Sequence, residues 1–204
     1  MMLEKIVLCL QVRTNSHRFK RKAFSMIKGN YFFLHCYYDL KKKFPDFDVW
    51  VLTSGKKSDD TLSKILKNKK INCFRGNLEN IVERFYSFSK KYNYKNYVRF
   101  TADNPFVAKK ENNELIKKHI RNNYDYSSNL DNLPKGKGID IFSNKLINDT
   151  FKKGKINNSL NKHLNSYILL NKSNYKVNIL TKKNLNNSYT IDTYKEYIKN
   201  IIKK

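Results

Sequence analysis

The feature that most constrains the fold is the alternation of short apolar runs with amphipathic stretches as far as Ile120. Apolar runs of about four to eight residues bounded by turn residues are typical of buried strands, and apolar residues three and four apart indicate helices. Strands that alternate with helices predict a mostly parallel sheet with helices packed against it. The sequence therefore predicts an α/β fold with three layers, of the Rossmann-like kind.

The expected elements follow from these patterns. The expected strands are residues 5–10, 47–53, 71–74, 97–101, 124–128, 138–142, 175–180 and 189–191. Helices are expected at 31–43, around 62–66, after Asn77 as its cap, around 115–120, at 146–151, at 160–170 and at the end of the chain. Ser58, Asp59 or Asp60 can cap the second helix, and Thr193 with Glu196 has capping-box spacing for the last one.

The alternation loosens after residue 124, which suits an inserted lobe or a dimerisation element. We therefore expect one domain over residues 1–204. Residues 1–123 form its α/β core, 124–187 its second part, and 188–204 a strand and helix that return to the core.

A cationic loop follows the first expected strand and contains neither glycine nor proline up to Lys22. It carries five positive charges and two hydroxyl groups, from Arg13, Arg18, Lys20, Arg21, Lys22, Thr14 and Ser16. In an open α/β sheet, ligands bind beyond the carboxyl ends of the strands. Because guanidinium and ammonium groups suit phosphate oxygens, we expect this loop to bind phosphate.

The net charge of +25 favours a nucleic-acid partner at first sight. However, 35 of the 42 basic residues are lysines, and they are spread along the whole chain. Lysine, asparagine, isoleucine, tyrosine and phenylalanine share A/T-rich codons, so codon bias explains the charge without a selected partner. We therefore expect no nucleic-acid partner, and a basic nucleic-acid-binding protein is kept as an alternative.

The three cysteines, Cys9, Cys36 and Cys73, lie far apart in apolar surroundings. They have neither a zinc spacing nor a disulfide pattern, which indicates buried thiols of a reducing compartment. The apolar run after Lys5 is too short for a signal peptide, and no run is long enough to span a membrane. We expect a cytoplasmic protein without a membrane contact.

Two aspartates are candidate metal ligands. Asp103 follows an expected inner strand and precedes Asn104-Pro105, so it is either a turn residue or a carboxylate that holds Mg²⁺ beside a triphosphate. Asp192 lies just outside the last helix with its side chain free, either as a solvated acid near the helix N-terminus or as a second ligand. The residues alone leave both alternatives open.

Six segments match one family in order and spacing over nearly the whole chain. They are Gln11 to Lys22, Phe74 to Phe85, Val98 to Pro105, Tyr124 to Asn129, His163 to Ile168, and Asp192-Thr193. In that order they resemble Q-x-R-x-x-S-x-R-L-P-G-K, F-R-G-x-x-x-D-V-x-x-R-Y, V-R-x-T-x-D-x-P, Y-D-Y-x-S-N, H-x-x-x-Y-I and D-T-P-E-D. These motifs are those of the cytidylyltransferases that activate acidic sugars as CMP derivatives, particularly the spore coat polysaccharide branch.

The resemblance implies transfer of CMP from CTP to an acidic sugar, with release of pyrophosphate, by a Mg²⁺-dependent homodimer in surface polysaccharide biosynthesis. It implies catalytic roles for Arg13, Lys22 and Asp103, and metal ligation by Asp103 and Asp192. The nucleotide-binding residues it implies are Gln11, Arg13, Ser16, Arg18, Lys22, Arg75 and Arg99. The acceptor sugar would be contacted by Asn129, Asp140 and His163.

The chain departs from the family pattern in the loop and around Asp140. The family's loop glycine is Asn15 here, its Pro-Gly pair is Lys20-Arg21, and G-x-D-x-E-x-F is shortened after Gly138. Glycine lets a backbone approach phosphates and adopt positive φ, which lysine and arginine adopt poorly. A degenerate relative that binds its partner without reacting is therefore the second hypothesis.

Overall fold

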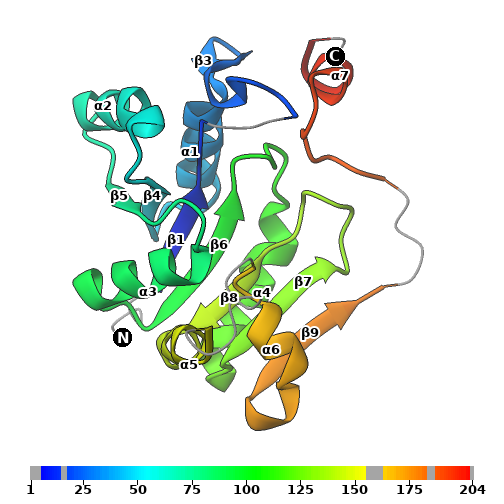
Figure 1. Cartoon of the computed structure of the whole chain (residues 1–204). Coiled ribbons are helices and arrows are strands. Elements are labelled where there is room, and N and C mark those ends of the chain that lie inside the picture. The colour runs from blue at the N-terminus through cyan, green and yellow to red at the C-terminus, as the bar shows by residue number, and fades with distance from the viewer. Residues whose placement is uncertain (1–5, 15–17, 155–162, 183–186, 203–204) are drawn as a thin grey trace.

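The computed structural model describes residues 6–14, 18–154, 163–182 and 187–202. A seven-stranded sheet with the strand order β5-β4-β1-β6-β8-β7-β9 forms its centre (Figure 1). Its strands are β1 (Ile6–Gln11), β4 (Asp48–Ser54), β5 (Cys73–Gly76), β6 (Asn96–Thr101), β7 (Tyr126–Asp131), β8 (Asp140–Ser143) and β9 (Val177–Thr181). A separate hairpin pairs β2 (Met26–Ile27) with β3 (Asn30–Tyr31).

Within this sheet, β8 runs antiparallel to both of its neighbours, and the other strand pairs are parallel. The carboxyl ends of the parallel strands therefore share one edge. The first turns after β1, β4 and β6 meet at that edge, together with the amino end of β8. This is the edge at which open α/β sheets bind ligands.

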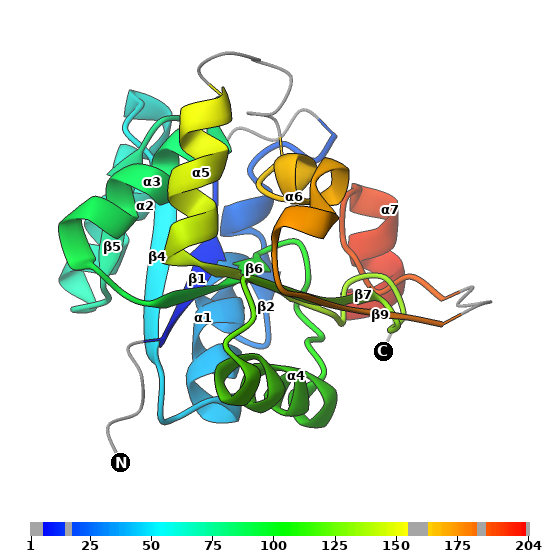
Figure 2. The same cartoon turned by 90° about the horizontal axis from the view of Figure 1, so that it is seen from below.

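Helices cover both faces of the sheet (Figure 2). The helices are α1 (Phe32–Lys43), α2 (Asp60–Asn68), α3 (Ile81–Tyr92), α4 (Lys109–Asn122), α5 (Asn144–Gly154), α6 (Ser166–Leu170) and α7 (Tyr194–Tyr197), which continues as a π-helix over Ile198–Ile202. Apolar residues of α1, α2 and α4 pack with Leu8 and Leu10 in one core, and those of α3, α5 and α6 pack with Val7 and Cys9 in the other. The predicted three-layer α/β fold with a mostly parallel sheet is confirmed.

Some predicted local features are wrong. Residues 189–191 form no strand, although Lys135 and Ser188 make an isolated bridge nearby. Asn80 rather than Asn77 caps α3, because the Asn80 side chain accepts the Glu83 N–H at 2.8 Å. Part of the helix expected at 160–170 lies outside the described residues, and α6 begins at Ser166.

The capping box expected at the last helix is confirmed, since Thr193 and Glu196 exchange both of its hydrogen bonds. Among the helices that the structure describes, none is both long and apolar enough to cross a membrane.

Candidate active site

A cavity of ≈ 860 Å³ opens at the edge where the carboxyl ends of β6, β7 and β9 meet. Its lining is rich in charge of both signs. The charged and titratable residues in it are Arg18, Arg99, Lys135, Lys182, His163, Asp103, Asp131, Asp140 and Asp192. The structure thus brings both predicted metal ligands and several predicted binding residues to one place.

The far end of the cationic loop contacts both candidate metal ligands. The Lys22 ammonium donates to a carboxylate oxygen of Asp103 and, at 2.8 Å, to the carbonyl of Ile191. Arg18 forms an ion pair with Asp192 at 3.2 Å. The side chain of Asp192, which the sequence analysis left free, therefore has a cationic partner. Lys22 is only 8% exposed, so its contact is much better shielded from water than that of Arg18.

The two aspartates are also connected through the backbone, since the Ile191 N–H donates to the Asp103 carbonyl at 2.8 Å. Carboxylate oxygens are the ligands that Mg²⁺ prefers, and Mg²⁺ is usually held by one or two carboxylates together with substrate phosphates and water. Among the described residues, no group of three or more His, Cys, Asp or Glu side chains gathers into a metal site. Asp103 and Asp192 are the two carboxylates at this end of the loop that could hold a divalent cation together with a bound phosphate.

The last helix holds the loop through aromatic packing. The Phe19 ring centroid lies 5.6 Å from that of Tyr194 and 5.5 Å from that of Tyr197. The Tyr197 hydroxyl also donates to the Met26 carbonyl. Sequence reasoning missed this contact, and the only signal for it was the pair of tyrosines on one face of a short terminal helix.

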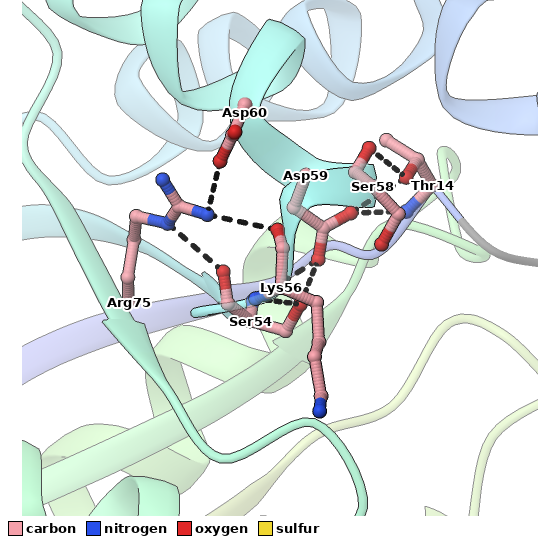
Figure 3. Close-up of polar contacts among 7 residues, drawn as sticks. All are labelled: Thr14, Ser54, Lys56, Ser58, Asp59, Asp60 and Arg75. Atoms are coloured by element: carbon pink, nitrogen blue, oxygen red, sulfur yellow. Dashed lines mark hydrogen bonds and ion pairs between the residues drawn. The ribbon is translucent and has the colours of Figure 1, made fainter.

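The near end of the loop is held differently, by the carboxylate of Asp59 (Figure 3). Asp59 is fully buried and accepts the Thr14 N–H at 2.9 Å and the Thr14 hydroxyl at 2.6 Å. Its other oxygen accepts the Ser54 N–H at 3.2 Å and the Ser54 hydroxyl at 2.5 Å. Burial alone would raise the pKa of Asp59, but the hydrogen bonds from Ser54 and Thr14 outweigh it and hold the pKa below its ordinary value.

Arg75, a predicted nucleotide-binding residue, uses its guanidinium to hold the turn between β4 and α2. It donates to the carbonyl of Ser54 at 3.0 Å, to the carbonyl of Lys56 at 2.9 Å and to the carboxylate of Asp60 at 2.6 Å (Figure 3). A planar guanidinium with donors on two sides suits this bridging position. Arg75 therefore holds the turn that carries Asp59, and that turn holds the loop at Thr14.

Arg84 is a buried residue of α3. Its guanidinium donates to the carbonyls of Asn77 at 2.8 Å and Leu78 at 3.0 Å. Burial lowers the pKa of Arg84, the nearby charge of Arg13 lowers it further, and Asp59 partly offsets both. Two arginines consequently concentrate positive charge beside the entrance of the loop.

Gln11 ends β1 at the same edge. Its amide nitrogen is buried and has no hydrogen-bond partner among the described residues, so it retains a donor for a ligand. Ser16, the other predicted nucleotide contact of the loop, lies outside the described residues. Arg13 is exposed beside Gln11.

The loop also contains a strained backbone position. Arg21 has φ 57° and ψ 20°, the left-handed conformation, at the position where the resembled family has the glycine of its Pro-Gly pair. A side chain in this conformation costs roughly 1–2 kcal/mol. The loop therefore keeps the backbone course that a glycine would favour, without the glycine.

Of the three residues expected to contact an acceptor, Asp140 and His163 line the cavity and Asn129 does not. Arg99 forms a bidentate ion pair with Asp140, at 2.7 Å for both hydrogen bonds, and both residues line the cavity. Burial would lower the pKa of Arg99, and Asp140 more than reverses this effect, so the pKa is raised. His163 also lines the cavity and is exposed.

Asn129 lies outside the cavity lining. It is 1% exposed, its amide nitrogen donates to Asn112 at 2.8 Å, and its oxygen accepts the Ile139 N–H at 2.8 Å. Both ends of the Asn129 amide thus connect β7 with its surroundings, which explains its burial without an acceptor contact.

The fold and the cavity define an α/β protein with a basic loop that contacts two carboxylates at the ligand-binding edge of its sheet. A family model described as cytidylyltransferase matches residues 7–203. The chain belongs to the cytidylyltransferase family and is accordingly a nucleotidyltransferase that uses CTP. The resemblance seen in the sequence is thereby confirmed.

Individual relatives are more distant. The chain is 29% identical over 197 residues to the uncharacterized protein MJ1063 of Methanocaldococcus jannaschii, covering 95% of the chain and 80% of that protein. It is 26% identical over 151 residues to the spore coat polysaccharide biosynthesis protein SpsF of Bacillus subtilis, covering 72% of the chain and 62% of SpsF. A solved cytidylyltransferase from Leptospira borgpetersenii shares the fold, with TM-score 0.83, 22% identity, and coverage of 95% of the chain and 83% of the other.

Proposed function

We propose that this protein transfers CMP from CTP to a hydroxyl group of an acidic sugar, with release of pyrophosphate. The observation that carries this proposal is the pairing of Arg18 with Asp192 and of Lys22 with Asp103, where Arg18 and both aspartates line one cavity. Basic and acidic groups facing each other across a cavity suit a ligand made of a polyphosphate and a divalent cation. The name of the relative SpsF supports a role in surface polysaccharide biosynthesis.

In this proposal, the basic residues of the loop hold the triphosphate. Arg13 and Lys22 oppose its negative charge, and Arg18 adds a further donor at the rim of the cavity. The amide nitrogen of Gln11, which has no partner within the described part of the chain, offers the nucleotide a neutral hydrogen bond. Arg75 and Arg99 contribute by holding neighbouring groups in place, because their guanidinium groups already bind the turn after β4 and Asp140.

Asp103 and Asp192 would hold Mg²⁺. When bound, the ion neutralises phosphate charge and orients the phosphorus that is attacked. Lys22 and Arg18 must then leave the two carboxylates, and the phosphates are the new partners that their charges require. The carboxylates and the cations thus exchange partners when CTP and Mg²⁺ bind together.

The remaining part of the cavity is proposed to bind the acceptor. Lys135 and Lys182 line it, and no carboxylate of the described residues forms an ion pair with either lysine. Two ammonium groups that line the cavity suit the carboxylate of an acidic sugar, although the charge of Lys135 also acts on Glu196 and helps to lower its pKa. Residues 1–123 would accordingly serve the nucleotide, and residues 124–187 the acceptor and a homodimer contact. We place the reaction in the cytoplasm, where the thiols of Cys9, Cys36 and Cys73 stay free.

The test is pyrophosphate release from CTP in the presence of Mg²⁺ and a panel of acidic sugars, with the matching neutral sugars as controls. We expect release with at least one acidic sugar and none with its neutral counterpart. Magnesium-dependent thermal stabilisation by CTP without turnover on any sugar would support the degenerate binding protein instead. A protein that neither binds CTP nor releases pyrophosphate would contradict the proposal.

A further inference from the structure

We propose that Asp59 is a positioning residue that fixes the N-terminal end of the nucleotide-binding loop, at Thr14, and thereby sets the affinity for CTP. The inference rests on the proposed function, because it concerns the same reaction. It adds a residue that lies outside the cavity and that the family motifs in the sequence did not single out.

The first argument is that both oxygens of the Asp59 carboxylate accept hydrogen bonds. One oxygen accepts two hydrogen bonds from Thr14, and the other accepts two from Ser54 (Figure 3). Thr14 belongs to the loop after β1, and Ser54 ends β4, which pairs directly with β1. The carboxylate therefore fastens the loop to the edge of the sheet, 45 residues away along the chain.

The second argument is that Asp59 gives up a common role of its residue type. It occupies the N-cap position of α2, yet its side chain accepts no hydrogen bond from the first turn of that helix. An aspartate cap typically stabilises a helix by about 1 kcal/mol. The side chain turns instead toward Thr14, so holding the loop is the function that its conformation serves.

The third argument is that the platform under the loop is itself rigid. Arg75 binds two carbonyls and one carboxylate of the turn between β4 and α2. The Thr14 hydroxyl has a single proton, which it can share between the Asp59 carboxylate at 2.6 Å and the Ser58 carbonyl at 2.8 Å, so two acceptors of this turn lie within its reach. Contacts pass from Arg75 through the turn to Asp59 and then to Thr14, as Figure 3 shows.

The consequence for function concerns Arg13, the neighbour of Thr14. Its exposed guanidinium lies close enough to Arg84 to lower the pKa of that residue, so the two cations repel each other. If Thr14 were not bound to Asp59, the N-terminal end of the loop could move and Arg13 could move away from this repulsion. Fastening Thr14 keeps Arg13 in place for a phosphate, and such preorganisation raises affinity by lowering the cost of ordering on binding.

The experiment separates the two sides of the carboxylate. Thr14→Val removes one hydroxyl at nearly constant shape, Thr14→Ser keeps it, and Ser54→Ala removes the donor on the opposite oxygen. Hydrogen bonds to charged groups contribute roughly 1.5–3 kcal/mol, so we expect Thr14→Val to raise KM for CTP by about tenfold. The value of kcat and the KM for the sugar should change by less than about twofold, since neither contact touches the acceptor.

Thr14→Ser should restore KM for CTP to nearly the wild-type value. Ser54→Ala should lower Tm more than Thr14→Val does, and should raise KM for CTP less. Asp59→Asn should show both effects, because an amide presents a donor where Thr14 or Ser54 also donates. Asp39→Asn is the matched control, since Asp39 pairs with Lys43 on α1 away from the loop, and it should change neither quantity.

A Thr14→Val protein that loses only Tm, or a Thr14→Ser protein that behaves like Thr14→Val, would overturn the inference. The Kd for CTP of each variant is measured beside turnover, which separates the two proposals. Turnover by the wild type with an unchanged CTP affinity in Thr14→Val overturns the role of Asp59 alone. CTP binding without turnover on any sugar overturns the proposed reaction, while the Kd series still decides the role of Asp59.

Discussion

The two ends of the basic loop are both held by aspartates, but in different ways. At the entrance, Thr14 is bound by a fully buried carboxylate through hydrogen bonds that no ligand needs to break. At the far end, Lys22 and Arg18 are bound by Asp103 and Asp192, the same carboxylates that are proposed to hold the metal. One end is therefore a permanent attachment, and the other is an ion-pair contact that binding must replace.

The difference shows how one end of a loop can keep its contacts while the other end exchanges them for contacts with a ligand. Buried hydrogen bonds to an aspartate are costly to leave unmade, so we expect Thr14 to stay bound to Asp59 both with and without a ligand. The pair Arg18 and Asp192 involves an arginine whose side chain is 67% exposed, and such pairs contribute about 1 kcal/mol or less. A triphosphate with a divalent cation can replace this contact at little cost.

The largest expected effect comes from the exchangeable end. Asp103→Asn removes a proposed metal ligand and the partner of Lys22 together, and should lower kcat for pyrophosphate release by about 10²–10³-fold. Its Tm should stay near that of the wild type, because the Asp103 side chain is 43% exposed. Turnover within about tenfold of the wild type would mean that the metal is held elsewhere.

Lys22→Met sharpens the comparison because two measurements should move in opposite directions. Loss of the ammonium should lower kcat/KM for CTP by about tenfold or more, the value of a charge-assisted contact with phosphate. The same change leaves Asp103 without its cation, so Mn²⁺ should bind more tightly in the absence of CTP. Calorimetric titration with Mn²⁺ tests this, and weaker metal binding would contradict the exchange of partners.

At the permanent end, the contribution of ionised Asp59 to the free energy of unfolding should depend on pH. Its pKa in the folded protein lies below the ordinary value of 3.8, so its ionised form stabilises the fold. That contribution is complete above the unfolded pKa and is lost as pH falls through the folded pKa. The stability difference between wild type and Asp59→Asn in urea unfolding should therefore shrink as pH falls below 4. A difference that grows in acid would show that the carboxylate is not stabilised by its hydrogen bonds.

The smallest effect concerns the strain between the two ends. Arg21→Gly relieves the left-handed conformation but adds freedom to the unfolded chain, so we expect a net gain of less than about 1 kcal/mol. Urea unfolding measures it. Lys20→Gly is the matched control, because Lys20 has no positive φ and should only lose stability. Equal changes in both variants would show that Arg21 is not strained.

Periodicity and motif spacing predicted much of the fold and part of the site. The strand before Asp103 and the helix after Thr193 were placed correctly because local patterns encode both. The candidates Arg99, Asp103, Asp140 and Asp192 do meet in one cavity. Asp103 was expected there because it follows a parallel strand, whereas the roles of Arg99, Asp140 and Asp192 came from the family resemblance.

Residues with two compatible roles were the ones that sequence reasoning assigned differently. Asp59 has the sequence position of a helix cap, and Arg75 that of a nucleotide contact, but both bind other parts of the protein. Asn129 fits a binding motif, yet its amide is used by Asn112 and Ile139. Spacing along the chain places a side chain on an element, and it does not show which distant group that side chain meets.

By itself, the sequence determined most of the order of strands and helices, the family and the chemical character of the loop. These depend on burial periodicity, capping and residue type, all of which act locally. The tertiary structure decided that Lys22 reaches Asp103 and that Asp59 holds Thr14. Both contacts join segments far apart in the chain, and only the packing of the sheet and its helices brings those segments within hydrogen-bonding distance.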